Sequence, residues 1–313
     1  MISRRHIRVK VMQTLYTLAS MPEMAAGKTI ESKGKVLLQE KFERTLDLFA
    51  VIVLYLSNVA QYAERDAAKR ASKYLPTEED LAVNTKLAGN TALWEIKGNN
   101  TLKARVDDRK LERYVHDEWV RKIYNNLAKS EAYSQYISSG DRDPVAEKKM
   151  MQYLWDKEML GNEAVADHFL DELPGWEDDK EVAAMLMQNF FRNGFAVNFL
   201  QLLSAEKAEY ARELLLNTLE REDYLMEIIA PKLANWDKER VALIDLILLR
   251  MGVCELLYFQ SIPTKVTINE YIEVAKQYST PQSGQYLNGV LDSIRKELES
   301  NGTINKEERY KKP

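Results

Sequence analysis

Apolar residues recur along most of the chain at spacings of three and four, which is the pattern of amphipathic helices. The segment 238–259 differs, because it is apolar at nearly every position and is interrupted by Asp245, Arg250 and Glu255. A helix that is apolar on almost all sides has to be covered on almost all sides. We therefore predict that this segment is the central helix of a bundle, since its charges exclude a membrane span.

Gly252 lies within this central helix. A missing side chain lets a neighbouring helix approach closely, which is the role that we favour for this glycine. The alternative is that Gly252 merely weakens the helix, at a cost of about 1 kcal/mol relative to Ala.

The same periodicity predicts the other helices, beginning with one that follows Ser3 as its N-cap. The remaining predicted helices span residues 34–73, 107–130, 145–173, 180–204, 206–219, 223–233, 268–278 and 281–298. Before the helix predicted over 268–278, Thr267 and Glu270 have the spacing of a capping box. Before the helix predicted over 281–298, Thr280 precedes a proline that fits a first helical position. No repeat of fixed period is present.

Composition supports an all-α fold. The chain has 313 residues, with only 12 glycines and 8 prolines to form turns, and 45% of its residues are hydrophobic, enough for a real core. Its single cysteine, Cys254, excludes an internal disulfide and a multi-cysteine metal site. Because Cys254 falls in the apolar central helix, we expect a core residue and not a nucleophile.

Charge is distributed unevenly. The net charge is −4, yet the first ten residues contain Arg4, Arg5, Arg8 and Lys10, and the first acidic residue is Glu23. Such a basic segment leading into a helix is typical of an RNA-binding arm. The alternative is a solvated terminus, whose exposed charges would contribute only a few tenths of a kcal/mol to stability.

Catalytic chemistry is not indicated. His116 and His168 lie beside charged residues, where surface positions are expected, and no Gly-rich phosphate loop occurs. The sequence predicts no enzyme, no cofactor and no metal site. The first residues lack a signal-peptide pattern, so we expect a cytoplasmic protein without a membrane partner.

Two C-terminal segments resemble the signature of the NusB family of bacterial transcription antitermination factors. They read IPTKVTINEYIEVAKQY (262–278) and QYLNGVL (285–291), and the preceding LLRMGVCELLY (248–258) is similar to a family helix. The N-terminal RRHIR (4–8) with Gln13, Leu15 and Tyr16 resembles the family's arginine-rich start.

The resemblance implies a NusB-like, two-subdomain, all-α helical bundle with a large helical insertion. It divides the chain into a basic arm and first helix (1–24), an insertion of unknown role (25–204), the helical core (205–298) and a polar tail (299–313). Both matching segments lie outside the insertion, whose own charges are mixed, so we expect RNA binding not to need it.

The resemblance also implies a function: binding of single-stranded boxA RNA together with the ribosomal protein NusE, within an antitermination complex of RNA polymerase on ribosomal RNA operons. Carried over by position, the RNA-binding residues are Arg4, Arg5, Arg8, Tyr16, Gln282, Ser283, Gln285 and Tyr286. The chain departs from the family at His6, Gln282 and Gly284, which puts the RNA preference in doubt.

Two alternative functions have to be compared with the sequence. An RNA methyltransferase would need an α/β nucleotide-binding domain and a catalytic cysteine, and the sequence offers neither. A non-catalytic protein–protein adaptor that has lost RNA binding stays open.

Overall fold

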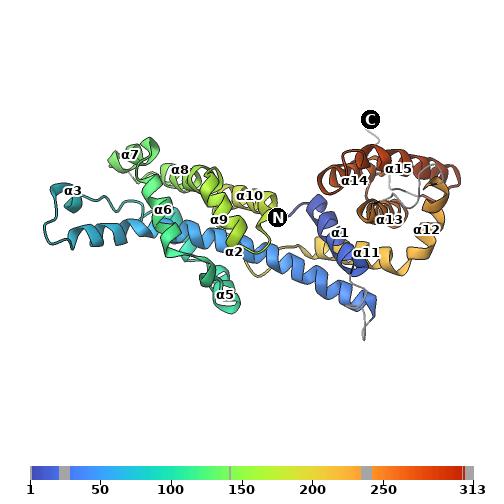
Figure 1. Cartoon of the computed structure of the whole chain (residues 1–313), viewed down its shortest axis with the longest axis horizontal. Coiled ribbons are helices and arrows are strands. Elements are labelled where there is room, and N and C mark those ends of the chain that lie inside the picture. Colours follow the sequence, from blue (N-terminus) through green and yellow to red (C-terminus); the bar gives the residue numbers. More distant parts are fainter. Residues whose placement is uncertain (1, 21–28, 141, 234–241, 305, 307–313) are drawn as a thin grey trace. The chain divides into compact units, whose positions relative to one another are not determined.

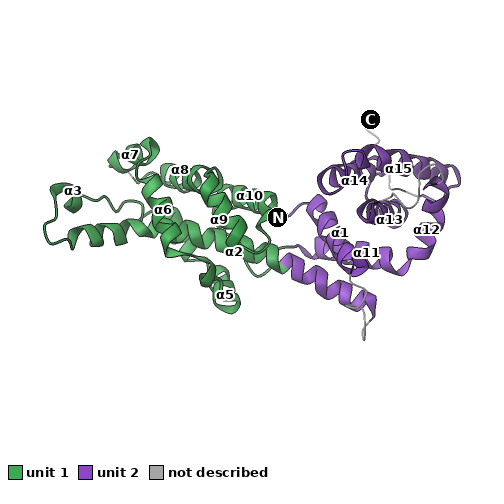
Figure 2. Ribbon diagram, viewed as in Figure 1, with its two compact units in different colours: residues 1, 43–202 green, residues 2–42, 203–313 purple. Residues whose placement is uncertain are grey.

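The structure is a computed structural model that describes residues 2–20, 29–140, 142–233, 242–304 and 306. Throughout these ranges every regular element is a helix, which confirms the all-α prediction. The chain forms two compact units (Figure 2). Unit 1 comprises residues 43–202, and unit 2 combines residues 2–42 with residues 203–313.

Unit 2 brings the start of the chain together with its C-terminal part. Its helices are α1 (Arg4–Ser20), the first part of α2 (Ile30–Ala71), α11 (Ala205–Glu220), α12 (Glu222–Ile229), η4 (Ala230–Leu233), α13 (Leu243–Tyr258), α14 (Thr264–Tyr278) and α15 (Ser283–Ser300). Helix α13 packs against α1, α11, α12, α14 and α15 (Figure 1). Every residue from Ile247 to Leu256 is buried, as predicted for a central helix.

Gly252 has the role that we favoured. A Cβ atom built on it would lie 2.9 Å from Cδ2 of Leu291 and 3.5 Å from Cδ2 of Tyr271. Helices α14 and α15 therefore approach α13 at a point where only glycine leaves room. Cys254 is also buried, and burial raises the pKa of its thiol to about 12, as expected of a core residue.

Unit 1 is built on the second part of α2, residues 43–71. Its other elements are α3 (Glu78–Leu81), α4 (Thr91–Lys97), α5 (Asn100–Arg109), η2 (Leu111–Tyr114), α6 (Asp117–Leu127), α7 (Glu131–Ser138), α8 (Pro144–Tyr153), η3 (Leu154–Leu160), α9 (Glu163–Glu172) and α10 (Trp176–Arg192). Phe49 of α2 packs edge-on against Phe190 and stacks on Phe199, at ring-centroid distances of 5.7 Å and 5.0 Å. These three aromatic rings form one part of the core of unit 1.

Several predicted helices are shorter than expected. The segment 107–130 is not one helix, because Lys110 adopts a left-handed conformation and Val115 is extended. The segment 145–173 is interrupted after η3, and α10 stops at Arg192 although the pattern continued to Ser204. Periodicity detects the apolar face of a segment, but it does not detect a local change of backbone direction.

The predicted capping box is wrong. Helix α14 begins at Thr264, so Thr267 lies in its first turn and donates its hydroxyl hydrogen to Glu255 at 2.8 Å. Glu270 accepts hydrogen bonds from Arg5. Tertiary partners have replaced the local cap. Helix α15 likewise begins at Ser283, two residues after the predicted start.

The surface position expected for His168 is also wrong. This residue is 6% exposed, its ring stacks on Trp119 with centroids 4.3 Å apart, and its Nε2 lies 2.9 Å from the hydroxyl of Tyr55. Burial lowers the pKa of His168. His116 keeps a side chain that is 40% exposed.

Helix α2 is long and apolar enough to cross a membrane, but 78% of its most apolar window is buried inside the structure. This burial is the property of a core helix. The predicted tail, 299–313, lies largely outside the described residues. Within it, Lys306 donates from Nζ to the backbone carbonyls of Glu255 and Phe259, at 2.9 Å and 2.8 Å.

Candidate nucleic-acid interface

The three arginines of the basic arm lie on the first two turns of α1, and each pairs with a carboxylate. Arg4 contacts Glu206 at 2.8 Å, and its side chain is 39% exposed. Arg5 donates two hydrogen bonds of 2.9 Å to Glu270 and is 44% exposed. The structure therefore shows the arm as an ordered helix that is held to α11 and α14.

Arg8 differs from the other two because it is buried. Its side chain is 2% exposed and forms two hydrogen bonds, of 2.9 Å and 2.7 Å, with the fully buried carboxylate of Glu255. Burial by itself lowers the pKa of Arg8, but the hydrogen bonds and charge of Glu255 outweigh it and the pKa is raised. The alternative of a solvated terminus with exposed charges is therefore wrong for Arg8.

Glu255 accepts hydrogen bonds from four residues on three helices. Besides Arg8 of α1, the hydroxyls of Tyr210 (α11), Thr267 (α14) and Tyr271 (α14) donate to it at 2.7, 2.8 and 3.3 Å. A buried carboxylate needs such partners, because an isolated buried charge is very costly. Arg8 thus fixes α1 against α13, and its charge is already satisfied inside the unit.

Glu270 links the buried pair to the surface. Its carboxylate binds Arg5 and also lies 3.5 Å from Nη1 of Arg8. The hydrogen bonds from Arg5 lower the pKa of Glu270. Arg4 and Arg5 are therefore the cations of the arm that reach solvent, at a surface that carries acidic side chains as well.

Tyr16, the remaining candidate on α1, is 42% exposed. It lies eight residues after Arg8, about 12 Å further along the helix. Its exposed ring is available for stacking, while its neighbours Leu15 and Leu18 are buried in the unit.

The second candidate group is gathered in the first turn of α15. Gln282 and Gln285 are exposed, whereas Ser283 is 2% and Tyr286 8% exposed. The hydroxyl of Ser283 donates to Oδ2 of Asp245 at 2.7 Å and accepts a hydrogen bond from the backbone of Thr280 at 3.2 Å. The glutamines are thus accessible to a ligand, while Ser283 holds α15 to the start of α13.

Helix α14 connects the two groups. Its Glu270 contacts Arg5, and its Lys276 lies beside the α15 turn, where a Cβ atom on Gly284 would be 3.1 Å from Cγ of Lys276. These α14 residues are six positions apart, about 9 Å along the helix. The structure brings Arg5 and Arg8 together at Glu270 of α14, while Arg4 contacts α11. The first turn of α15, with Gly284, lies beside Lys276 of α14.

Sequence reasoning did not connect three charged residues with this region, namely Glu255, Glu270 and Lys276. Glu255 and Glu270 bind Arg8 and Arg5, which lie far away in the chain. Lys276 lies against the first turn of α15. Lys276 could have been found, because it precedes the polar group 282–285 by only six residues. Within the described ranges, no group of three or more His, Cys, Asp or Glu side chains is placed to hold a metal ion.

Comparison with known proteins extends these observations. Residues 177–296 match the model of the NusB family. This range begins within α10 and includes α11 to α14 and most of α15. The first helix lies outside the matched range, but α1 packs against α11, α13 and α14 in the same unit.

Three similar proteins are each named Transcription antitermination protein NusB. The one from Salinibacter ruber is 45% identical over 98 residues, 31% of this chain and 61% of the relative. The one from Finegoldia magna is 39% identical over 100 residues, 32% of this chain and 73% of the relative. The one from Chloroherpeton thalassium is 45% identical over 78 residues, 25% of this chain and 37% of the relative.

Two of these matches thus span less than two thirds of the relative's length, and all leave most of this chain unmatched. The match to the Finegoldia magna protein covers nearly three quarters of that protein at 39% identity. The matched helices α11 to α15 lie in unit 2, where every regular element that the structure describes is a helix. These findings show that the chain belongs to the NusB family.

Proposed function

We propose that this chain is a cytoplasmic, RNA-binding transcription antitermination factor. It binds boxA-type single-stranded RNA together with the ribosomal protein NusE, and it supports transcription of ribosomal RNA operons within an antitermination complex of RNA polymerase. The observation that carries this proposal is membership of the NusB family over residues 177–296. The packing of α1 on the matched helices supports it, because the arm then belongs to the same unit.

The accessible residues have the chemistry that single-stranded RNA requires. Cations fix the phosphate backbone, and aromatic rings and amides contact unstacked bases. Arg4 and Arg5 supply charge, Tyr16 an exposed ring, and Gln282 and Gln285 amides. In this proposal Arg8, Ser283 and Tyr286 support the surface from within, because they are buried.

The carboxylates that pair with Arg4 and Arg5 do not prevent phosphate binding. Both ion pairs are partly exposed, and exposed pairs contribute only about 0.2–1 kcal/mol. A phosphate can therefore replace Glu206 or Glu270 as the partner at small cost. A bidentate phosphate contact also suits the planar guanidinium group.

One observation favours a second function. All three arm arginines already have carboxylate partners within the chain, as expected if the surface no longer serves RNA. The alternative is a non-catalytic protein–protein adaptor on a NusB-like scaffold, with the large unit 1 taking over the binding of partners.

A titration separates the two functions. Labelled boxA-like RNA and a scrambled RNA of the same composition are titrated with the full chain, with and without purified NusE. We expect preference for boxA and tighter binding with NusE, by about 5- to 150-fold for a coupling of about 1–3 kcal/mol. If NusE binds the chain while neither RNA does under any condition, the adaptor function is correct.

A further inference from the structure

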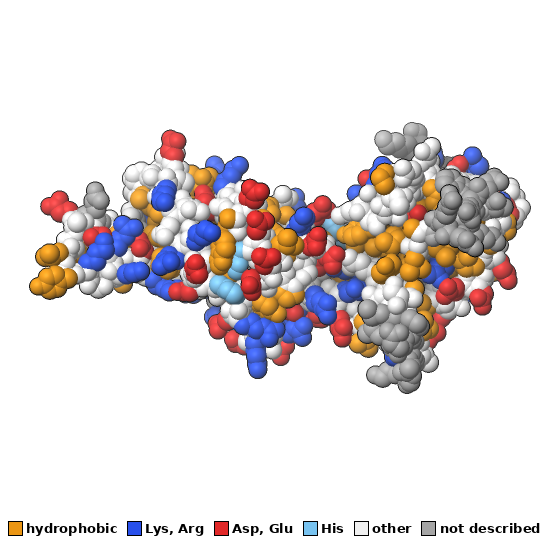
Figure 3. All heavy atoms as spheres, in the orientation of Figure 1, with side chains coloured by type: hydrophobic (Ala, Val, Ile, Leu, Met, Phe, Trp, Pro, Cys, Tyr) orange, Lys and Arg blue, Asp and Glu red, His pale blue; other side chains and the backbone are white. Residues whose placement is uncertain are grey.

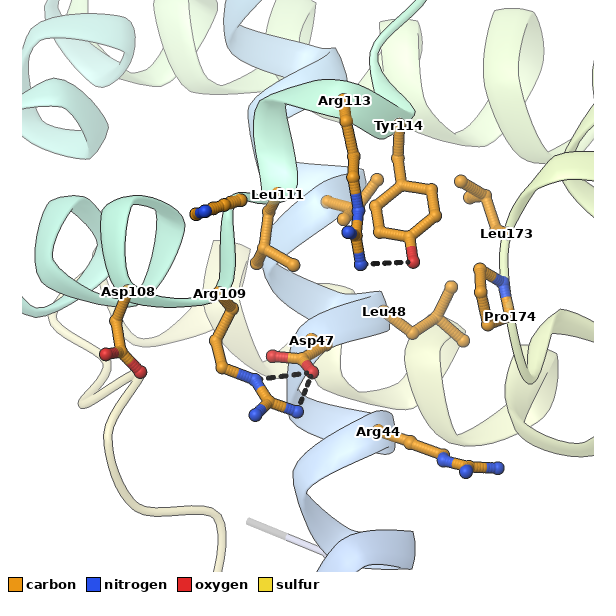
Figure 4. A pocket seen from close by; sticks show the side chains of 12 residues that line it. Arg44, Asp47, Leu48, Asp108, Arg109, Leu111, Arg113, Tyr114, Leu173 and Pro174 are labelled. Carbon is orange, nitrogen blue, oxygen red and sulfur yellow. Dashed lines mark hydrogen bonds and ion pairs between the residues drawn. The ribbon is translucent and has the colours of Figure 1, made fainter.

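Unit 1 contains a pocket that the proposed function does not use (Figure 4). It has a volume of about 530 Å³ and lies between α2, α5, η2 and the segment that follows α9. Pockets of roughly 300–1,000 Å³ are the usual size for small-molecule ligands. All of its lining residues precede residue 177, where the family match begins.

Positive charge dominates the pocket. Four cations line it, and they are Arg44, Arg109, Lys110 and Arg113. Two carboxylates, Asp47 and Asp108, also line it. On the face drawn in Figure 3, Lys and Arg side chains gather over α5, the helix that ends at this pocket.

Asp47 does not neutralise the free cations. It accepts hydrogen bonds of 3.1 Å and 3.0 Å from Arg109 and another of 2.8 Å from Arg105, a side chain that is 5% exposed. This carboxylate is therefore shared between two guanidinium groups. It orients Arg109 at the pocket edge and leaves the other cations of the pocket to a ligand.

Three cations remain available. Neither Arg44 nor Lys110 forms a side-chain hydrogen bond or ion pair within the part of the chain that the structure describes. Arg113 donates to the hydroxyl of Tyr114 at 3.0 Å and lies 4.8 Å from the centre of its ring. Unlike Arg4, Arg5 and Arg8 of unit 2, these side chains have no carboxylate partner among the described residues.

The backbone places the cations around one space. Lys110 has φ 52° and ψ 47°, the left-handed region that residues with side chains adopt rarely. This residue ends α5 and begins η2, so that Arg109 and Arg113 border the same pocket from successive elements (Figure 4).

One wall of the pocket is apolar. Leu48 of α2, Leu111 of η2 and Leu173 after α9 line it and are almost fully buried. Tyr114 projects between Arg113 and this wall in Figure 4. A simple inorganic anion would use the cations and leave the wall without contact, whereas a ligand that joins an anionic group to a flat ring would use both.

We propose that this pocket binds a nucleotide unit, with its phosphate on the Arg44, Lys110 and Arg113 side chains and its base against the wall beside Tyr114. Guanidinium groups bind phosphate through paired hydrogen bonds, and aromatic rings stack on bases. The nucleotide is either free or part of an RNA strand. This site goes beyond the proposed function, since it uses other residues in the other unit.

The test is calorimetric titration of the full chain with AMP, with pyrophosphate and with a twelve-nucleotide oligoadenylate. It uses the Arg4→Ala/Arg5→Ala background, so that the proposed interface in unit 2 does not contribute. We expect AMP to bind, and Arg44→Ala/Arg113→Ala to weaken it at least tenfold. The matched control, Lys129→Ala/Lys149→Ala, removes the same charge from exposed positions of unit 1 and should change affinity less than twofold.

Two further measurements identify the source and the contacts. If oligoadenylate binds at least tenfold more tightly than AMP, with the same loss of affinity in Arg44→Ala/Arg113→Ala, the ligand is an RNA strand. If the two affinities are equal, the ligand is a free nucleotide. Tyr114→Ala should weaken AMP several-fold and leave pyrophosphate unchanged.

The proposal is overturned if neither AMP nor oligoadenylate distinguishes Arg44→Ala/Arg113→Ala from the control. It is also overturned if a polyglutamate peptide competes as well as AMP. Both outcomes can be distinguished from those of the boxA titration. That experiment measures the preference for boxA over scrambled RNA in a chain that keeps Arg4 and Arg5, whereas this one compares pocket variants in the Arg4→Ala/Arg5→Ala background.

Discussion

The guanidinium of Arg8 and the carboxylate of Glu255 form a bidentate ion pair in the interior of unit 2. The two side chains are 2% and 0% exposed, and their hydrogen bonds are 2.9 Å and 2.7 Å long. The pair joins the first helix of the chain to the central helix. Because the loss of Arg8 should affect the fold, RNA binding by the arm has to be tested at Arg4 and Arg5 alone.

Arg8→Ala should destabilise unit 2 strongly. Removing one partner of a buried ion pair leaves an uncompensated charge, and the cost is about 3–5 kcal/mol. Urea unfolding followed by circular dichroism measures it. The double variant Arg8→Met/Glu255→Leu should recover part of the loss, although the hydroxyls of Tyr210 and Thr267 lose their acceptor. A loss below about 1 kcal/mol for Arg8→Ala would contradict a structural role.

Arg4→Ala/Arg5→Ala should weaken RNA binding without unfolding the chain. If each arginine contacts a phosphate, the slope of log affinity against log salt should flatten by about 0.7 per contact, or roughly 1.4 in total. A salt series of RNA titrations measures the slope. The control Arg212→Ala/Arg295→Ala removes two arginines of the same unit that are likewise paired with carboxylates. Equal slopes in the two variants would place the RNA elsewhere.

The first turn of α15 should govern sequence preference. Gln282→Ala/Gln285→Ala removes exposed amides, so the difference in affinity between boxA and scrambled RNA should shrink while the salt slope persists. Ser283→Ala should instead lower stability by about 1–3 kcal/mol, because the buried carboxylate of Asp245 loses a donor. RNA titrations and thermal unfolding of both variants separate the two effects. If Gln282→Ala/Gln285→Ala still discriminates between boxA and scrambled RNA as well as the unchanged chain does, these glutamines do not contact bases.

Unit 1 should lose stability in mild acid because of His168. Burial lowers the pKa of His168 in the folded state, so the unfolded chain takes up the proton first as the pH falls. The stabilisation is complete above the ordinary histidine pKa of about 6.5 and is lost as the pH falls through the lower, folded-state pKa. Melting temperatures between pH 7.5 and 5 measure this loss. His168→Gln should show a shallower decline, and an identical decline would mean that other groups cause it.

The architecture of unit 2 could largely be predicted from periodicity. A helix that is apolar on all sides specifies a covered central element, and the burial of residues 247–256 confirms it. In the helix predicted over 281–298, the residues Leu287, Leu291, Ile294 and Leu298 recur at spacings of three and four, and all four are buried. Gly252 could be interpreted because a glycine in such a helix has few other roles. These features depend on each segment's own pattern of apolar residues.

The burial and the hydrogen-bond partners of the candidate site residues could not be predicted in the same way. Arg8 has no acidic neighbour nearby in the sequence, and its partner lies 247 residues away. Ser283 is likewise held by Asp245, 38 residues away. At Thr267 and Glu270 the local capping signal was present, but tertiary donors and acceptors gave better partners. Local rules describe these side chains only where no distant charge competes for them.

The separation between Arg8 and Glu255 has a consequence for biosynthesis. The ribosome makes α1 before α13, so Arg8 is present in the nascent chain long before its partner Glu255. At roughly 5–20 residues per second, the intervening 247 residues take roughly 12–50 s to translate. Until residues 205–220 of α11 and then 243–258 of α13 have been made, neither helix covers the apolar face of α1, with Ile7, Val11 and Leu15. Nascent chains of this protein therefore carry an uncovered segment that is both apolar and positively charged, the kind of segment that chaperones bind during translation.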